Sequence, residues 1–134
     1  MSVSSVLAAT TDRDRKRTVI DGTHLERMTL GDRGLEREVL ELFVRQTTIM
    51  LGRIVGAEPA LAAAAAHTLK GSARGIGAWR VAHAAELVES AAIGEGAPSA
   101  MEEAVTELEA ASLEASAAIG ARLSGLIAEL SRTR

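Results

Sequence analysis

The sequence has little of the residues that build several common classes of protein. It contains no cysteine, so it can form neither a disulfide framework nor a thiolate metal site. This absence agrees with a reducing compartment, and we expect a cytoplasmic protein. Aromatic residues make up 1% of the chain. Period-two alternation and runs of β-branched or aromatic residues are also absent, so the sequence indicates no β-strand.

Long apolar runs and an excess of charge are missing as well. No uninterrupted apolar stretch approaches the roughly 18 residues of a membrane span, and the N-terminus lacks the basic region and apolar run of a secretion signal. The formal net charge of -3 gives no field that would hold a nucleic-acid backbone. We therefore expect a soluble protein that binds neither membrane nor nucleic acid.

The residues that are present suit one helical domain. The chain has 134 residues, of which 47% are hydrophobic and 25% charged, and this length fits one ordinary domain with one core. Residues 1–20 are first rich in Ser and Thr and then charged, without a sustained apolar period. We predict a flexible N-terminal tail over residues 1–20 and a folded domain over residues 21–134.

Periodicity and capping signals predict five helices in that domain. Ser/Thr-x-x-Glu spacings at Thr23–Glu26 and Ser99–Glu102 resemble capping boxes and would open the first and last helices. Pro59 suits the first position of a helix, and Gly77 suits a helix end. The predicted helices run over about residues 23–29, 35–54, 59–76, 79–93 and 99–130.

Four of these helices are long and joined by short connections, so their apolar faces should share one core. On residues 35–54 the predicted apolar stripe contains one polar side chain, Gln46, which we expect near the functional site or between helices. The fold class is therefore all-α, an antiparallel up-and-down four-helix bundle with a short extra N-terminal helix. The stripe on the long helix comprises Leu35, Val39, Leu42, Phe43, Gln46, Ile49, Met50 and Ile54, and that on residues 59–76 comprises Leu61, Ala65, Leu69, Ala73 and Ile76.

A second face of the helix over residues 59–76 carries unusual chemistry. With the apolar residues pointing inward, His67, Lys70, Gly71, Arg74 and Ala78 fall together on the opposite side, toward solvent. A neutral imidazole is an uncharged nucleophile near pH 7, and a fixed ammonium can offset charge on phosphoryl oxygens. The spacing of His67 and Lys70 therefore suits phosphoryl transfer, which depends on positioning and electrostatics.

Gly71 is unexpected in an alanine-rich helix, because Gly costs about 1 kcal/mol relative to Ala in a helix interior. Bare backbone one turn after His67 would let another protein's active site approach the imidazole. Tight helix packing inside the bundle would need the same missing methyl group. Gly71 alone does not decide between these two interpretations.

The segment Ala66-His67-Thr68-Leu69-Lys70-Gly71-Ser72-Ala73, followed by Gly77-Ala78 and Leu87-Val88-Glu89, resembles the signature of histidine phosphotransfer (HPt) domains. The resemblance covers about residues 20–130. It implies a four-helix bundle whose exposed histidine, here His67, is phosphorylated on its outer ring nitrogen.

The resemblance also implies roles for the neighbouring residues. Lys70 would steady the phosphoryl group, and Gly71 would leave room for the aspartate pocket of the partner. Glu89 would accept a hydrogen bond from the inner ring nitrogen of His67 and so select its tautomer. Arg74, Gly75 and Ala78 complete the surface that we expect to contact the partner.

The expected partners are receiver domains of response regulators and a histidine kinase or hybrid kinase. The chain lacks a Gly-x-x-x-x-Gly-Lys-Ser/Thr loop, so we expect a stoichiometric phosphoryl carrier that is no enzyme and depends on a donor kinase. We expect no intrinsic cofactor or metal, Mg²⁺ being supplied by the partner receiver domain, and a monomer. His24 and His83 are interpreted as ordinary histidines, since the paired Glu-x-x-His segments of a di-iron bundle are missing.

Two alternatives stay open at this point. The first is a phosphorylation-independent helical adaptor that docks a receiver or a kinase through the same face. The second is the phosphotransfer module of a chemotaxis-type kinase, separated from its catalytic domains. A chain that begins at Met1 and ends close to its last helix favours an independent protein.

Overall fold

The computed structural model describes residues 18–94 and 97–132, and within these ranges every regular element is a helix. This confirms the predicted all-α class. The helices are α2 (Gly22–Met28), α3 (Arg33–Ile54), α4 (Pro59–Ile76), α5 (Trp79–Ile93) and α6 (Pro98–Arg132).

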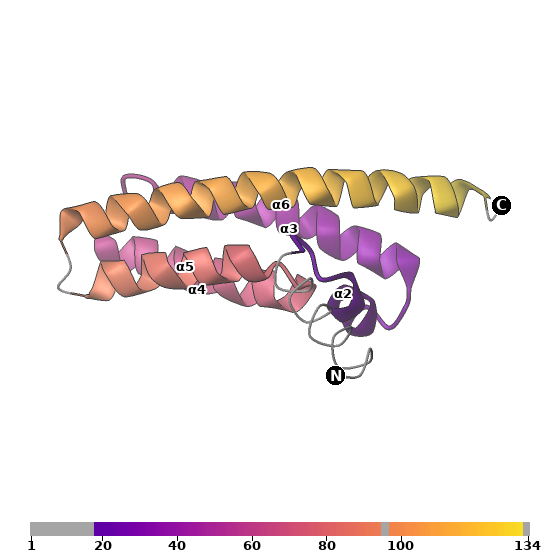
Figure 1. The fold of residues 1–134 in the computed structure, drawn as a ribbon, viewed down its shortest axis with the longest axis horizontal. Coiled ribbons are helices and arrows are strands. Elements are labelled where there is room, and N and C mark those ends of the chain that lie inside the picture. The colour runs from indigo at the N-terminus through magenta and orange to yellow at the C-terminus, as the bar shows by residue number, and fades with distance from the viewer. Residues whose placement is uncertain (1–17, 95–96, 133–134) are drawn as a thin grey trace, which may run out of the picture.

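The four long helices form the predicted bundle. Each packs against its sequence neighbour, and α6 closes the ring by returning to α3, so α4 and α6 lie diagonally across the bundle. Figure 1 shows α6 running along the whole length of the bundle, with α2 lying across the end where α4 turns into α5. The short helix packs chiefly against α4.

The boundaries of α4 and α5 agree with the sequence prediction, but both predicted capping boxes are wrong. The N-cap of α2 is Asp21, whose Oδ1 accepts a hydrogen bond from the His24 backbone N–H at 3.1 Å. Thr23 therefore lies inside the first turn. In α6 the helix begins at Pro98, which places Ser99 inside the first turn as well. A carboxylate and a proline started these helices earlier than the hydroxyl side chains would have done.

The buried face of α3 is rotated away from the predicted stripe. Leu40, Phe43 and Ile54 are buried, whereas Leu42 and Ile49 are 48% and 52% exposed. The buried face also carries two polar residues, which interrupt its apolar pattern, so the sequence did not indicate that this face is buried. These are Glu36, 1% exposed, and Thr47, whose hydroxyl donates to the Phe43 carbonyl oxygen at 2.7 Å.

Other leucines and isoleucines predicted on inner faces are also exposed, because alanines take the inner positions. On α4, Leu61 is 62% exposed while Ala62, Ala65 and Ala66 are buried. Alanine lets neighbouring helices approach closely, so the bundle needs few large side chains there. Leu87 of α5 and Ile127 of α6 are exposed as well.

Asp21 fastens the start of the domain to the turn between α4 and α5. Its backbone N–H donates to the Gly77 carbonyl oxygen at 2.9 Å, and its Oδ2 accepts from the Trp79 indole at 3.1 Å. Gly77 ends α4 with φ +79°, and a Cβ there would lie 2.9 Å from that of Asp21. Glycine is thus required at this turn by both conformation and space.

The predicted tail lies mostly outside the described residues, which begin at Thr18. Ile20 is buried at 6% exposure, so packed structure already includes this residue. No helix among the described residues combines the length and apolarity that a membrane crossing requires.

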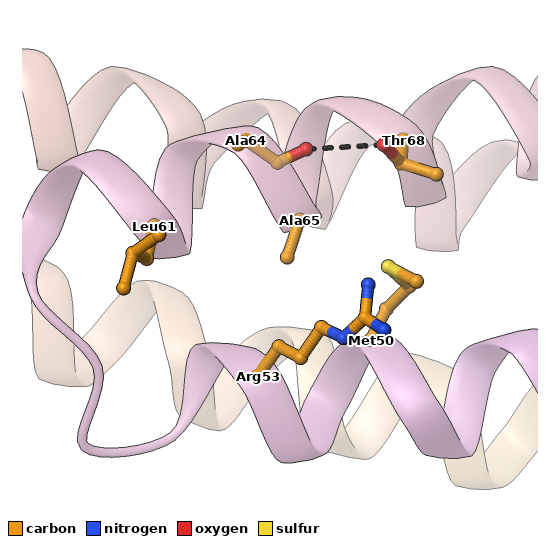
Figure 2. Close-up of a pocket in the computed structure, with 6 residues that line it drawn as sticks. All are labelled: Met50, Arg53, Leu61, Ala64, Ala65 and Thr68. Carbon is orange, nitrogen blue, oxygen red and sulfur yellow. Dashed lines mark hydrogen bonds between the residues drawn. The ribbon is translucent and has the colours of Figure 1, made fainter.

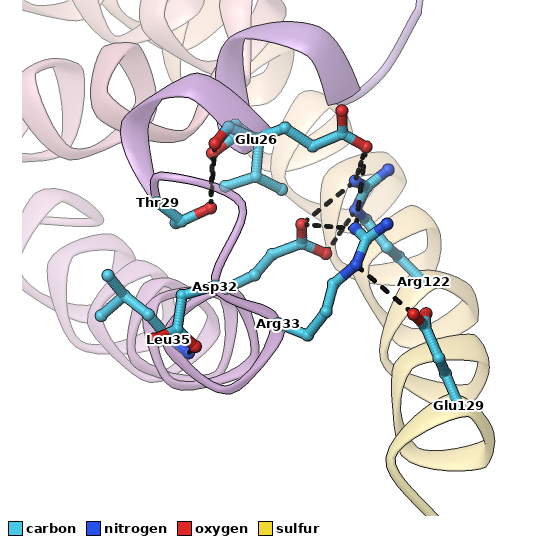
Figure 3. A network of polar contacts seen from close by, with 9 residues as sticks. Glu26, Thr29, Asp32, Arg33, Leu35, Arg122 and Glu129 are labelled. Atoms are coloured by element: carbon cyan, nitrogen blue, oxygen red, sulfur yellow. Dashed lines mark hydrogen bonds and ion pairs between the residues drawn. The ribbon is translucent and has the colours of Figure 1, made fainter. Parts of the chain in front are cut away.

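A buried ion-pair cluster joins α2, α3 and α6 at this end of the bundle (Figure 3). Glu36 accepts from Arg122 Nε at 2.9 Å and Nη2 at 3.3 Å, and from Arg33 Nη1 at 3.4 Å. Glu26 and Glu129 lie at its rim, with ion-pair distances of 3.6–3.7 Å. The buried carboxylate is therefore paired from two helices.

Candidate functional site

His67 projects from the middle of α4 into solvent, with 68% of its side chain exposed. The helix presents it outward because Ala62, Ala66 and Leu69 on the inner face are fully buried. The orientation predicted for His67 from helical spacing is therefore the one in the structure.

Glu89 of α5 holds His67 and Lys70 together. Its Oε2 lies 2.7 Å from His67 Nδ1, and its Oε1 accepts a hydrogen bond from Lys70 Nζ at 2.6 Å. The close packing of α4 against α5 brings these residues together across 19 and 22 positions of sequence. One carboxylate thus bridges the imidazole and the ammonium group.

This bridge determines which ring nitrogen of His67 is available. An ionised carboxylate only accepts hydrogen bonds, so Nδ1 must be the protonated nitrogen that donates to Glu89. In the neutral ring Nε2 then carries the free lone pair. Because Nδ1 faces Glu89 and the side chain is exposed, the nucleophilic nitrogen is the one that a partner can reach.

The charges around Glu89 keep it ionised. The hydrogen bond from Lys70 is the largest cause and lowers the pKa of Glu89 below its ordinary value of 4.5; burial opposes this in part, and the contact with His67 lowers the pKa further. Glu89 is therefore a carboxylate near neutral pH. As an anion it can stabilise positive charge that develops on the imidazole during reaction.

Lys70 lies beside Glu89 in the structure. Its side chain is only 13% exposed, and its ammonium donates a hydrogen bond to the Glu89 carboxylate. An ammonium has three N–H donors, so this bond leaves others for a phosphoryl oxygen. In the structure, the contact that Lys70 makes is with the carboxylate that orients His67.

The surroundings of Gly71 decide between the two interpretations of this glycine. A Cβ built on Gly71 meets no atom within 4 Å, and the residue is exposed. Helix packing inside the bundle therefore does not require glycine at this position. The interpretation that remains is access to the backbone from outside, one turn beyond His67.

The other residues expected to contact a partner are placed differently from one another. Arg74 is exposed on the same side of α4, with a long ion pair of 3.9 Å to Glu86. Gly75 is half-buried and also has open space where a Cβ would lie. The prediction that Ala78 contacts a partner is wrong, because Ala78 is fully buried. Its backbone N–H donates to the Ala73 carbonyl oxygen at 2.8 Å, at the end of α4.

A shallow groove of about 250 Å³ continues this face toward α2, and part of its wall was predicted to lie in the core. Gln46 lies in the groove and accepts a hydrogen bond from the Ser72 hydroxyl at 3.0 Å. It therefore bridges α3 and α4, which was one of the two positions predicted for it. The signal that could have revealed the groove was the width of the predicted α3 stripe, which exceeds one buried face. The lining comprises Leu25, Met28, Thr29, Val39, Leu42, Phe43, Gln46, Ser72, Gly75 and Ile76.

The remaining histidines lie apart from this site. His24 Nε2 is 2.9 Å from the Arg74 carbonyl oxygen, and its ring lies 4.8 Å from that of Trp79. His83 is exposed on α5. Among residues 18–94 and 97–132, no three His, Cys, Asp or Glu side chains are grouped so that they could hold a metal ion.

The fold and this site define a helical bundle with an exposed, carboxylate-oriented histidine. The family model of the Hpt domain matches residues 38–132, which include His67, Lys70, Gly71 and Glu89. The chain belongs to the Hpt domain family, whose members are phosphocarrier modules of two-component signalling that interact with kinases and response regulators. Neither a curated protein nor a solved structure matches the chain.

Proposed function

We propose that this protein is a stoichiometric phosphoryl carrier, which accepts a phosphoryl group on Nε2 of His67 and passes it to the aspartate of a receiver domain. The observation that carries the proposal is the Glu89 carboxylate bridging His67 Nδ1 and Lys70 Nζ beside an imidazole that is 68% exposed. A histidine serving only the fold would not need a carboxylate partner on one nitrogen and solvent on the other.

The proposed transfer balances without a further reactant. The Nε2 lone pair attacks the phosphorus of an aspartyl phosphate, the P–N bond forms, and the P–O bond to the donor aspartate breaks with release of its carboxylate. In the second step the roles reverse, and the acceptor carboxylate takes the phosphoryl group from Nε2. The Mg²⁺ that offsets phosphoryl charge would be held by the receiver domain.

The residues around His67 each have a defined part in this proposal. Glu89 keeps the proton on Nδ1, and its negative charge stabilises the imidazolium character that develops as Nε2 bonds to phosphorus. Lys70 holds the carboxylate in place and directs a further N–H toward the phosphoryl oxygens. Gly71 lets the aspartate pocket of the receiver reach the nitrogen.

The docking surface is proposed to be the exposed face of α4 together with the groove toward α2. Its apolar wall includes Met28 and Leu42, which are 56% and 48% exposed, so a docked partner would bury apolar surface there. The partners would be receiver domains and a histidine or hybrid kinase, and the chain would act as a monomer in the cytoplasm.

The experiment is phosphotransfer from phosphorylated receiver domains or a hybrid kinase in magnesium buffer, comparing the wild type with His67→Gln. We expect acid-labile, alkali-stable label on the wild type and none on the variant. His83→Gln, on an exposed histidine away from the site, is the matched control and should be labelled like the wild type. A folded wild-type protein that takes no label from several donors would favour the phosphorylation-independent adaptor.

A further inference from the structure

A second groove lies between α3 and α4 (Figure 2). It has a volume of about 500 Å³ and is formed by Met50 and Arg53 of α3 with Leu61, Ala64, Ala65 and Thr68 of α4. Thr68 directly follows His67 in the sequence, and Ala64 lies one turn before it. The groove is therefore adjacent to the phosphoryl-transfer site, yet none of its lining residues belongs to the His67–Glu89–Lys70 arrangement.

Leu61 gives this groove a large apolar side chain that the bundle core does not use. Leu61 stands among alanines that have higher helix propensity, and 62% of it is exposed although it borders an apolar wall. The bundle core does not use it, since Ala62 and Ala65 take the inner positions. Together with Met50, Leu61 and the alanines of α4 give the groove a contiguous apolar wall with Arg53 beside it, and an apolar patch next to polar groups is typical of a protein-binding surface.

Arg53 gives the groove its charge. No ion pair or hydrogen bond to its guanidinium occurs among the described residues, and Figure 2 shows it lying between the two helices. The Thr68 hydroxyl donates to the Ala64 carbonyl oxygen at 3.2 Å, so its proton is used within α4. Arg53 is consequently the single charged group in an apolar lining, which fits an aliphatic side chain next to a carboxylate.

The position of the groove connects it with docking at His67. A partner of standard size covers about 800 Å² per side, which corresponds to a patch about 16 Å in radius. Leu61 lies six residues before His67, hence about 9 Å along the helix axis. A protein that encloses Nε2 of His67 would therefore also reach this groove.

We infer that the groove formed by Met50, Arg53, Leu61, Ala64, Ala65 and Thr68 is a specificity site for the partner receiver domain, which inserts an aliphatic side chain against Leu61 and pairs a carboxylate with Arg53. This inference rests on the proposed function. His67, Lys70 and Glu89 offer the same chemistry to every receiver domain. Partner choice must then come from neighbouring residues such as Leu61 and Arg53.

The test measures the affinity of purified receiver domains, loaded with Mg²⁺ and beryllofluoride, for Leu61→Ala and Arg53→Gln. Neither substitution threatens the fold, because both residues are exposed and alanine is the better helix former. Each should weaken the tightest-binding receiver by about 10-fold, as removal of an interface anchor does. Arg53→Lys should restore part of the loss by returning the charge.

Matched controls are Leu113→Ala, which removes an exposed leucine from α6, and Arg132→Gln, which removes a cation from the last turn of α6 just as Arg53 lies in the last turn of α3. Both should bind like the wild type. Phosphoramidate, a small donor that needs no docking, should label His67 equally in all variants.

The two proposals fail in different ways. Wild-type affinity in Leu61→Ala and Arg53→Gln, or no binding of any receiver domain to the wild type, would overturn the specificity site. Binding that depends on Leu61 and Arg53 without label on His67 from any donor would support the groove and overturn the carrier function instead.

Discussion

Two clusters in this bundle use the same chemistry for different ends. In each, one glutamate bridges two cationic or hydrogen-bonding side chains: Glu89 joins His67 to Lys70, and Glu36 joins Arg33 to Arg122. Glu36 is 1% exposed and lies at the centre of a cluster that joins three helices, whereas the cluster at Glu89 ends in an imidazole that is 68% exposed. Burial thus distinguishes a cluster that holds the fold from one that presents a nucleophile.

The largest effect on stability should come from breaking the buried cluster. Arg122→Met removes the closest partner of Glu36 and leaves a buried carboxylate with only the longer contact to Arg33, so we expect a loss of about 3 kcal/mol in the free energy of unfolding. Denaturant titration measures it.

Arg80→Met is the control for this change, because the Arg80–Glu114 pair, at 2.6 Å, is even shorter than the Arg122–Glu36 pair but lies in solvent. Its loss should be about 0–1 kcal/mol. Equal losses in the two variants would contradict the structural role assigned to Glu36.

The cluster at Glu89 should respond in activity more than in stability. Glu89→Ala frees the His67 ring from its fixed tautomer, so the rate of phosphoryl transfer should fall by about 10- to 100-fold, the range seen when a residue that orients a histidine is removed. The free energy of unfolding should fall by less than in Arg122→Met, because Lys70 and Glu89, 13% and 22% exposed, are less buried than Glu36. Glu86→Ala on the same helix, whose contact with Arg74 is long and exposed, should leave the rate unchanged.

Gly71 should show stability and function moving in opposite directions. Gly71→Ala adds a methyl group into open space within a helix, so the free protein should gain up to about 1 kcal/mol in stability. Transfer from a receiver domain should nonetheless slow, because the methyl group obstructs the approach to His67. Gly120→Ala, also open and on the diagonally opposite helix α6, should gain stability without slowing transfer.

The smallest effect concerns pH. Because the pKa of Glu89 is lowered, its contacts with Lys70 and His67 are intact above the ordinary value of 4.5 and are lost only as pH falls through the lower folded value. Carboxyl ¹³C NMR should give a Glu89 midpoint below 4.5. Lys70→Met should raise that midpoint more than His67→Ala does, since the Lys70 hydrogen bond is the larger cause. A midpoint at or above 4.5 in the wild type would contradict the bridge.

The sequence predicts the bundle well because its helices are marked by strong local signals. Pro59 and Gly77 bound α4 as predicted, since each acts through its own backbone conformation. The site residues His67, Lys70 and Gly71 fall on one helix, so spacing alone places them together. Glu89 was placed by the family resemblance, because its partners lie on another helix.

The errors arose where packing between helices overrides local pattern. Glu36 is buried only because Arg122, 86 positions later, pairs with it, and no local signal carries that information. Leu42 and Leu61 have large apolar side chains like those of core residues, but they line grooves that are open in the free protein. Ala78 was misplaced because the turn at Gly77 takes it off the face of α4 and into the core.

The central claim concerns one atom, Nε2 of His67, and NMR of the phosphorylated, ¹⁵N-labelled protein tests it most directly. The bridge to Glu89 predicts ³¹P coupling to Nε2, with the proton retained on Nδ1. Phosphorus bonded to Nδ1, or to any other residue, would contradict the account.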